Sequence, residues 1–237
     1  MAYSRCVCVL SLPRSGSSTV AGMLHRLGVD MGAGHFQGHD TSNPRGYYED
    51  LRFQELAKSL SGERYGTRKP AAIPEQTQRK YSALIAERAT LPLWGFKGPR
   101  TVFVLRHILP LLEQAGVDTR FIIVMRDTAA ITGSLCRHSE VSYNGRFRME
   151  PDRAAAVVNV WLGALREAVE LTDEDKTLCV LYEEVLKNPQ LTAERLAEFA
   201  CAGLPVGVAP WRIEHAAAFV DRSLNHHADS DSRSYTG

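Results

Sequence analysis

The sequence predicts an α/β protein of three layers, in which helices cover both faces of a central, mostly parallel β-sheet. Short apolar runs of strand length alternate along the chain with longer segments of helical period. That alternation is typical of parallel sheets whose strands are joined by helices. The run at residues 121–125 is apolar throughout, as expected of a central strand covered on both faces.

The predicted elements follow one another from a first strand near the N-terminus to a late helix. The strand candidates are residues 5–12, 93–97, 120–125 and 177–181. The helix candidates are residues 17–27, 50–60, 75–89, 102–115, 128–137, 152–172 and 192–201. The segment 152–172 has the clearest period, because Val158, Trp161 and Leu165 recur at helical spacing beside charged residues. We expect that apolar stripe to pack in the core.

Length and composition predict a single domain. The chain has 237 residues, of which 44% are hydrophobic, and this is enough apolar material for one sizeable core. We place the domain at residues 1–224. Residues 225–237 are polar and show no period, so we expect a flexible tail there.

Charge, cysteine spacing and hydropathy argue against several classes of function. The formal net charge is +1 and no long basic run occurs, which disfavours nucleic acid as a partner. The five cysteines lack metal-ligand or disulfide-scaffold spacing, so we expect reduced thiols and no metal site. The apolar run at residues 6–12 is too short for a signal segment or a membrane span. These features predict a cytoplasmic protein without a membrane partner.

A loop rich in hydroxyl groups follows the first predicted strand. It reads Pro13-Arg14-Ser15-Gly16-Ser17-Ser18-Thr19 and leads into an apolar helical segment. A helix N-terminus offers N–H groups and a favourable dipole to an anion. Gly16 lacks a Cβ that would block close approach of the backbone, and Arg14 can fork onto phosphate oxygens. A Ser/Gly stretch alone fits a helix cap equally well, but the preceding strand and Arg14 favour a phosphate site.

This loop resembles the 5′-phosphosulfate loop of the sulfotransferases that use 3′-phosphoadenosine-5′-phosphosulfate (PAPS). The resemblance implies that the 5′-phosphate and the bridging oxygen are held by Arg14, Ser15, Gly16, Ser17, Ser18 and Thr19. It also implies the sulfotransferase fold, which is similar to that of P-loop nucleoside triphosphatases. The Gly-x-x-x-x-Gly-Lys-Ser/Thr spacing of those triphosphatases is missing here.

Two later segments resemble the same family in the same order. Arg126 at a strand end and Ser134 on the following helix resemble the motif that holds the 3′-phosphate. Across a strand, a turn and a helix, such a pair can converge on one phosphate, although in isolation Arg126 and Asp127 fit a simple ion pair at a strand end. Tyr182 is similar to the family's adenine-contacting tyrosine, whereas taken alone it reads as a core aromatic.

Lys97 and Glu49 are the catalytic candidates, and both rest on the resemblance. Lys97 resembles the strand-end lysine that many sulfotransferases place near the leaving oxygen. Relatives with a Lys-Thr-His motif carry a histidine base two residues after that lysine, where this chain has Pro99. Residues 43–50 resemble the segment from which carbohydrate sulfotransferases draw a glutamate base, which implies Glu49.

Other assignments of the base remain open in the sequence. Glu49 and Asp50 fit equally well as caps of the helix that begins near residue 51. His35 and His39, on the adjacent loop, are weaker candidates, because loop histidines are usually just exposed.

The resemblance implies transfer of a sulfuryl group from PAPS to a hydroxyl or amine by in-line displacement, with release of PAP and without a metal. The acceptor class stays open among a small molecule, a carbohydrate and a peptide, and a homodimer is also left open. One alternative is a P-loop small-molecule kinase, although a Gly-Lys-Ser/Thr motif and an evident Mg²⁺-binding acid are missing. The other is a catalytically silent member that binds a nucleotide or a partner, since the usual histidine is absent.

Overall fold

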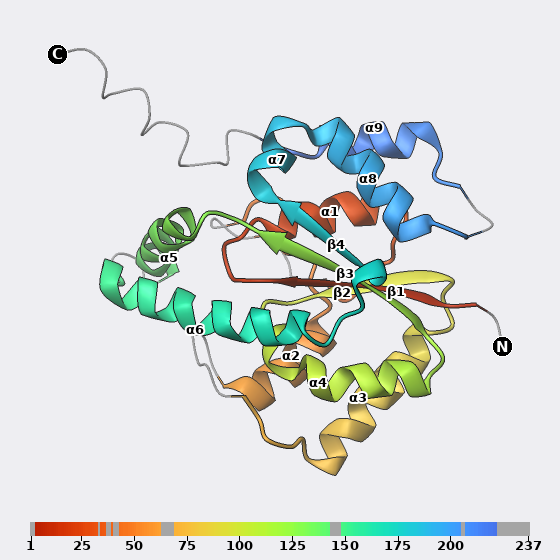
Figure 1. Ribbon diagram of the computed structural model, residues 1–237, viewed down its shortest axis with the longest axis horizontal. Coiled ribbons are helices and arrows are strands. Elements are labelled where there is room, and N and C mark those ends of the chain that lie inside the picture. Colours follow the sequence, from red (N-terminus) through yellow and green to blue (C-terminus); the bar gives the residue numbers. More distant parts are fainter. Residues whose placement is uncertain are drawn as a thin grey trace.

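Four parallel strands form the centre of the computed structural model (Figure 1). The structure describes residues 3–32, 34–36, 39, 43–62, 69–142, 148–204 and 207–221. The strands are β1 (Arg5–Ser11), β2 (Leu93–Lys97), β3 (Asp118–Met125) and β4 (Thr177–Leu181). Their order in the sheet is β2-β1-β3-β4, and each neighbouring pair is parallel. The predicted α/β class is therefore confirmed, whereas the tail predicted at 225–237 lies outside the described residues.

Helices cover both faces of the sheet, which gives the predicted three layers (Figure 1). One layer contains α1, α7, α8 and α9, and the opposite layer contains α2, α3, α4 and α6. The helices are α1 (Ser17–Leu27), α2 (Leu51–Ser61), α3 (Glu75–Arg88), α4 (Thr101–Gln114), α5 (Thr128–Ser142), α6 (Pro151–Val169), α7 (Tyr182–Lys187), α8 (Pro189–Cys201) and α9 (Pro210–Ala218), with a 3-10 turn at Glu174–Lys176.

The sequence pattern missed two of these helices. The six residues of α7 are too few to show a helical period, and the nine of α9 are only slightly more. Their positions depend on packing against α8, with which both are in contact. No described helix is both long enough and apolar enough to cross a lipid bilayer.

Strand β1 supplies side chains to both halves of the core. Val7 and Val9 point into the cluster formed with α1 and α8, whereas Cys6 and Cys8 point into the cluster on the opposite face. This alternation follows from the period of two in a strand. Burial raises the pKa of both thiols, so these cysteines act as small apolar side chains rather than as nucleophiles.

The carboxyl ends of all four strands lie at one edge of the sheet. Val9 pairs with Lys97, Ser11 pairs with Val124, and Val124 pairs in turn with Val180. The loop at residues 13–19, Arg126 and Tyr182 follow β1, β3 and β4 directly, and Lys97 is the last residue of β2. Ligands of open α/β sheets bind outside the carboxyl ends of the strands, so this edge is where a site is expected.

Gly95 in β2 lies where no side chain fits. A Cβ there would lie 2.5 Å from the carbonyl oxygen of Val7 and 2.9 Å from the sulfur of Met31. We expect Gly95→Ala to lower the free energy of unfolding by roughly 1–3 kcal/mol, because the neighbouring strand must shift.

Gly163→Ala in α6 is the matched control, since nothing lies within 4 Å of its added Cβ. This substitution should raise the free energy of unfolding by about 0.5–1 kcal/mol, as alanine favours a helix interior. Urea denaturation of the two variants measures both effects. Equal stabilities would contradict the close approach of β2 to β1.

Candidate functional site

The loop at residues 13–19 connects β1 to α1 through two left-handed residues. Arg14 has φ 66° and Gly16 has φ 86°. Gly16 is also the N-cap residue of α1, so the first turn of this helix has no side-chain cap. An anion can therefore occupy the position in front of the helix, where the N–H groups and the helix dipole favour negative charge.

Ser15 lies inside this loop with an unsatisfied hydroxyl group. The residue is 1% exposed, and its Oγ has no hydrogen-bond partner among the described residues. A buried hydroxyl without a partner is costly, and a phosphate or sulfate oxygen would satisfy it. The residues of the loop thus fit an anionic ligand.

Arg14, Ser134 and Arg126 meet beside the loop. The Nε of Arg14 donates a hydrogen bond to Oγ of Ser134 at 3.1 Å. The Nη1 of Arg126 donates to the carbonyl oxygen of Arg14, also at 3.1 Å. The structure thus places the two residues expected at the 3′-phosphate next to the loop expected at the 5′-phosphate.

Tyr182, the first residue of α7, packs directly on the loop. A Cβ on Gly16 would lie 2.1 Å from Cδ2 of the tyrosine ring, so only glycine permits this contact. The guanidinium of Arg126 lies 4.9 Å from the centre of the same ring. Burial lowers the pKa of the Arg126 guanidinium, and the carboxylate of Glu183 acts in the opposite direction. An anion bound here would offset the cost of burying that cation.

Lys97 and Glu49 form a buried ion pair at the end of β2. The Nζ of Lys97 lies 2.6 Å from Oε1 of Glu49, and the two residues are 3% and 4% exposed. The ammonium also donates to Oγ of Ser18 at 3.0 Å and to the carbonyl oxygen of Tyr47 at 3.1 Å. The second carboxylate oxygen of Glu49 accepts a hydrogen bond from Nε2 of Gln54 at 2.9 Å.

The two neighbouring carboxylates have different partners. Asp50 is the N-cap residue of α2, and its side chain accepts a hydrogen bond from the backbone N–H of Arg52 at 3.0 Å. Of the two residues that the sequence offered as caps of this helix, Asp50 is the cap, whereas Glu49 forms an ion pair with Lys97. The weaker candidates His35 and His39 are both exposed.

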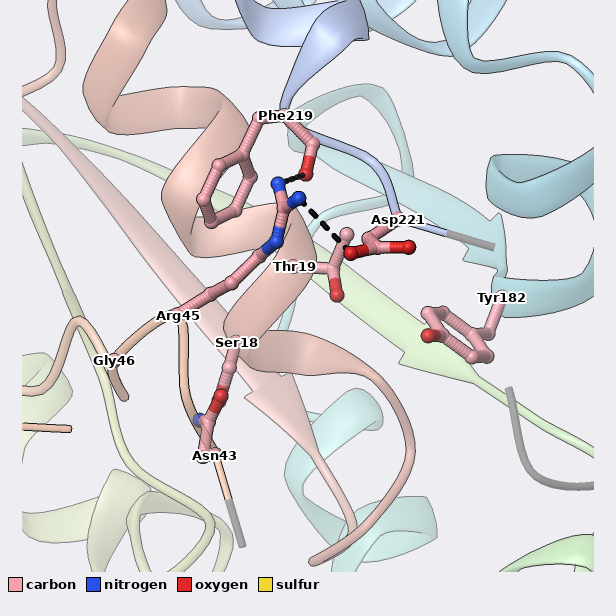
Figure 2. Close-up of a pocket in the computed structure, with 8 residues that line it drawn as sticks. All are labelled: Ser18, Thr19, Asn43, Arg45, Gly46, Tyr182, Phe219 and Asp221. Atoms are coloured by element: carbon pink, nitrogen blue, oxygen red, sulfur yellow. Dashed lines mark hydrogen bonds and ion pairs between the residues drawn. The ribbon is translucent and has the colours of Figure 1, made fainter. Parts of the chain in front are cut away.

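A small pocket, open to solvent, lies beside the start of α1 (Figure 2). Figure 2 shows Arg45 extended toward Phe219 and Asp221. Arg45 donates to the carbonyl oxygen of Phe219, and its Nη2 lies 3.0 Å from Oδ2 of Asp221. The lining residues are Ser18, Thr19, Asn43, Arg45, Gly46, Tyr182, Phe219 and Asp221.

Sequence reasoning did not single out Arg45, Phe219 or Asp221 as site residues. Arg45 lies inside the segment 43–50 that implied Glu49, so that segment could have indicated it as well. Phe219 follows a short helix, and no local sequence pattern indicates it. Among the residues that the structure describes, no group of three or more His, Cys, Asp or Glu side chains is placed to hold a metal ion.

Comparison with known proteins places this chain among sulfotransferases. The profile of the sulfotransferase family matches residues 7–206. The comparison with curated protein sequences found no match.

Three solved structures are similar to this one in fold. The sulfotransferase domain from the curacin biosynthetic pathway is 19% identical, with a TM-score of 0.51 over 93% of this chain and 84% of that chain. Sulfotransferase STF9 from Mycobacterium avium is 15% identical, with a TM-score of 0.54 over 96% of this chain and 69% of that chain. Sulfotransferase STF1 from Mycobacterium tuberculosis H37Rv is 15% identical, with a TM-score of 0.52 over 92% of this chain and 71% of that chain.

Removing one partner of the Lys97–Glu49 pair should destabilise the protein more than removing both. Lys97→Met or Glu49→Leu leaves a buried charge without its counter-ion, which we expect to cost roughly 3–5 kcal/mol. The double variant carries neither charge and should recover part of that loss. Urea denaturation of the four proteins gives the coupling free energy, and simple additivity would contradict the buried pair.

Proposed function

This chain belongs to the sulfotransferase family, and on that premise we propose that it transfers a sulfuryl group from PAPS to a hydroxyl or amine of an acceptor and releases PAP. One observation carries the proposal. The loop at residues 13–19 contacts Lys97 through Ser18 and contacts Arg126 through the carbonyl oxygen of Arg14. Groups suited to the leaving oxygen and to a second phosphate are therefore adjacent to one anion-binding loop.

Two neighbouring phosphate subsites support PAPS rather than ATP as the ligand. The start of α1 and the hydroxyl of Ser15 suit the 5′-phosphosulfate. Arg126 and Ser134 suit a 3′-phosphate, because both contact Arg14 at the side of the loop. In this proposal Tyr182 contacts the adenine, and the hydroxyls of Ser17, Ser18 and Thr19 complete the first subsite.

Lys97 stabilises the leaving group in the proposed reaction. As the acceptor oxygen or nitrogen forms its bond to sulfur, the bond between sulfur and the bridging oxygen breaks, and charge develops on the 5′-phosphate. The ammonium of Lys97 and the hydroxyl of Ser18 already share a hydrogen bond at the start of α1. A preorganised cation of this kind stabilises the developing charge without having to reorganise.

Glu49 is the proposed base and takes the acceptor proton. Protonation would neutralise the carboxylate and weaken its 2.6 Å ion pair with Lys97. The lysine would then direct more of its charge to the departing oxygen. Proton removal from the acceptor and stabilisation of the leaving group are thus coupled through one contact.

Titration calorimetry with PAP tests the donor assignment. We expect the protein to bind PAP and to show no comparable affinity for ATP with Mg²⁺. Arg126→Ala and Ser134→Ala should each weaken PAP by about tenfold or more, since each removes a hydrogen bond to a charged phosphate. Arg79→Ala, which removes an exposed arginine of α3, is the control. Tight ATP binding without PAP binding would instead favour the kinase alternative.

Kinetics with labelled PAPS test the catalytic assignments. Pools of small molecules, carbohydrates and peptides first identify an acceptor. Glu49→Gln keeps the side-chain size and should lower kcat by roughly 10²–10⁴-fold, while PAP affinity stays the same. Lys97→Met should lower kcat as well, because the leaving oxygen loses its cation. Full rates in both variants would refute these roles.

A further inference from the structure

Tyr48 adopts a backbone conformation that bulky residues rarely take. Its φ is 53°, and among the described residues only Tyr48 and Arg14 combine a positive φ with a side chain. A left-handed tyrosine is strained, and such strain persists only where the surroundings enforce it. Because Tyr48 precedes Glu49 in the chain, the strain lies next to the proposed base.

The left-handed turn at Tyr48 lets the residues on either side of it, Tyr47 and Glu49, reach the ammonium group of Lys97. The carbonyl oxygen of Tyr47, on one side of the turn, lies 3.1 Å from Nζ of Lys97. The carboxylate of Glu49, on the other side, lies 2.6 Å from the same nitrogen. In an extended chain the side chain of Glu49 stands roughly perpendicular to the plane that contains the carbonyl group of Tyr47. The left-handed conformation of Tyr48 instead brings both acceptors to Lys97.

An aromatic cluster fixes the ring of Tyr48. The ring centre lies 5.4 Å from that of Phe36, 5.7 Å from that of Phe219 and 5.8 Å from that of His25. Phe36 and Phe219 meet the tyrosine edge to face, with interplanar angles of 67° and 86°. The hydroxyl of Tyr48 accepts a hydrogen bond from Nη1 of Arg26 at 3.0 Å.

Phe219 brings a distant part of the chain into this cluster. It follows α9 and lies beyond residues 7–206, which the family profile matches. Its ring packs against α1 so closely that a Cβ on Gly22 would lie 2.2 Å from Cε1. The guanidinium of Arg26 lies 3.7 Å from the centre of the Phe219 ring. Arg45 also holds the Phe219 carbonyl oxygen, as Figure 2 shows.

We propose that Tyr48 is a positioning residue for sulfuryl transfer, whose ring, held by Phe219 and Arg26, maintains the turn that presents Glu49 to Lys97. This inference rests on the proposed roles of Lys97 and Glu49. It adds that the segment after α9 contributes to catalysis through Tyr48, without a contact to the reacting groups.

Three variants separate positioning from simple packing. Tyr48→Phe keeps the ring and should retain most of kcat. Tyr48→Ala removes the anchor and should lower kcat on the order of 10²-fold, the cost of a small misplacement of reacting groups, without changing KM for PAPS or PAP affinity. Phe219→Ala should shift kcat in the same direction by a smaller factor, and it serves as the test if Tyr48→Ala fails to fold. Unchanged kcat in the folded variants, or a loss of PAP affinity that matches the loss of rate, would overturn the proposal.

The chemical reactivity of Lys97 provides a readout that needs no acceptor. In the native protein Lys97 is 3% exposed and its ammonium is paired with Glu49, so reductive methylation should modify it slowly. Tyr48→Ala should accelerate that modification, whereas Tyr48→Phe should not, with the exposed Lys80 as the internal reference in peptide mass spectrometry.

The two readouts distinguish failure of this inference from failure of the proposed function. Accelerated methylation of Lys97 in a protein that does not bind PAP would support the positioning of the pair and refute PAPS as donor. Lys97 could instead be methylated at the same rate in the native protein, in Tyr48→Ala and in Tyr48→Phe, while the enzyme turns over PAPS. That result would refute the role of Tyr48 and leave the proposed function intact.

Discussion

The buried ion pair between Lys97 and Glu49 is the interaction on which the candidate site depends. A charge can remain in the interior only if a counter-ion and hydrogen bonds replace its hydration. The ammonium of Lys97 meets this demand with the carboxylate of Glu49, the hydroxyl of Ser18 and the carbonyl oxygen of Tyr47. These three bonds join the end of β2, the start of α1 and the segment before α2 at one point.

The loop at residues 13–19 joins Lys97 to the rest of the candidate site. Its Ser18 contacts Lys97, its Arg14 contacts Ser134, and its Gly16 lies against the ring of Tyr182. A ligand that binds at the start of α1 would therefore interact with both ends of the site. Closely packed contacts of this kind allow little independent movement of the two halves.

The segment that follows α9 contacts the candidate site from beyond residues 7–206, which the family profile matches. Phe219 packs on Tyr48, and Arg45 joins the carbonyl oxygen of Phe219 to the carboxylate of Asp221. In the proposal above, these contacts support the turn at Tyr48. Arg45, Phe219 and Asp221 also line the pocket beside the loop.

The sequence by itself determined the fold class, the bounds of β2, β4 and α1, and the location of the loop between β1 and α1, because periodicity and the order of strand, loop and helix are local features. It did not reveal α7 or α9, which are too short to show a period. Only the tertiary structure decided that Asp50 caps α2 while Glu49 pairs with Lys97, a contact across 48 residues. It alone brought Tyr48 and Phe219 together, since contacts between distant residues leave no periodic pattern in the chain.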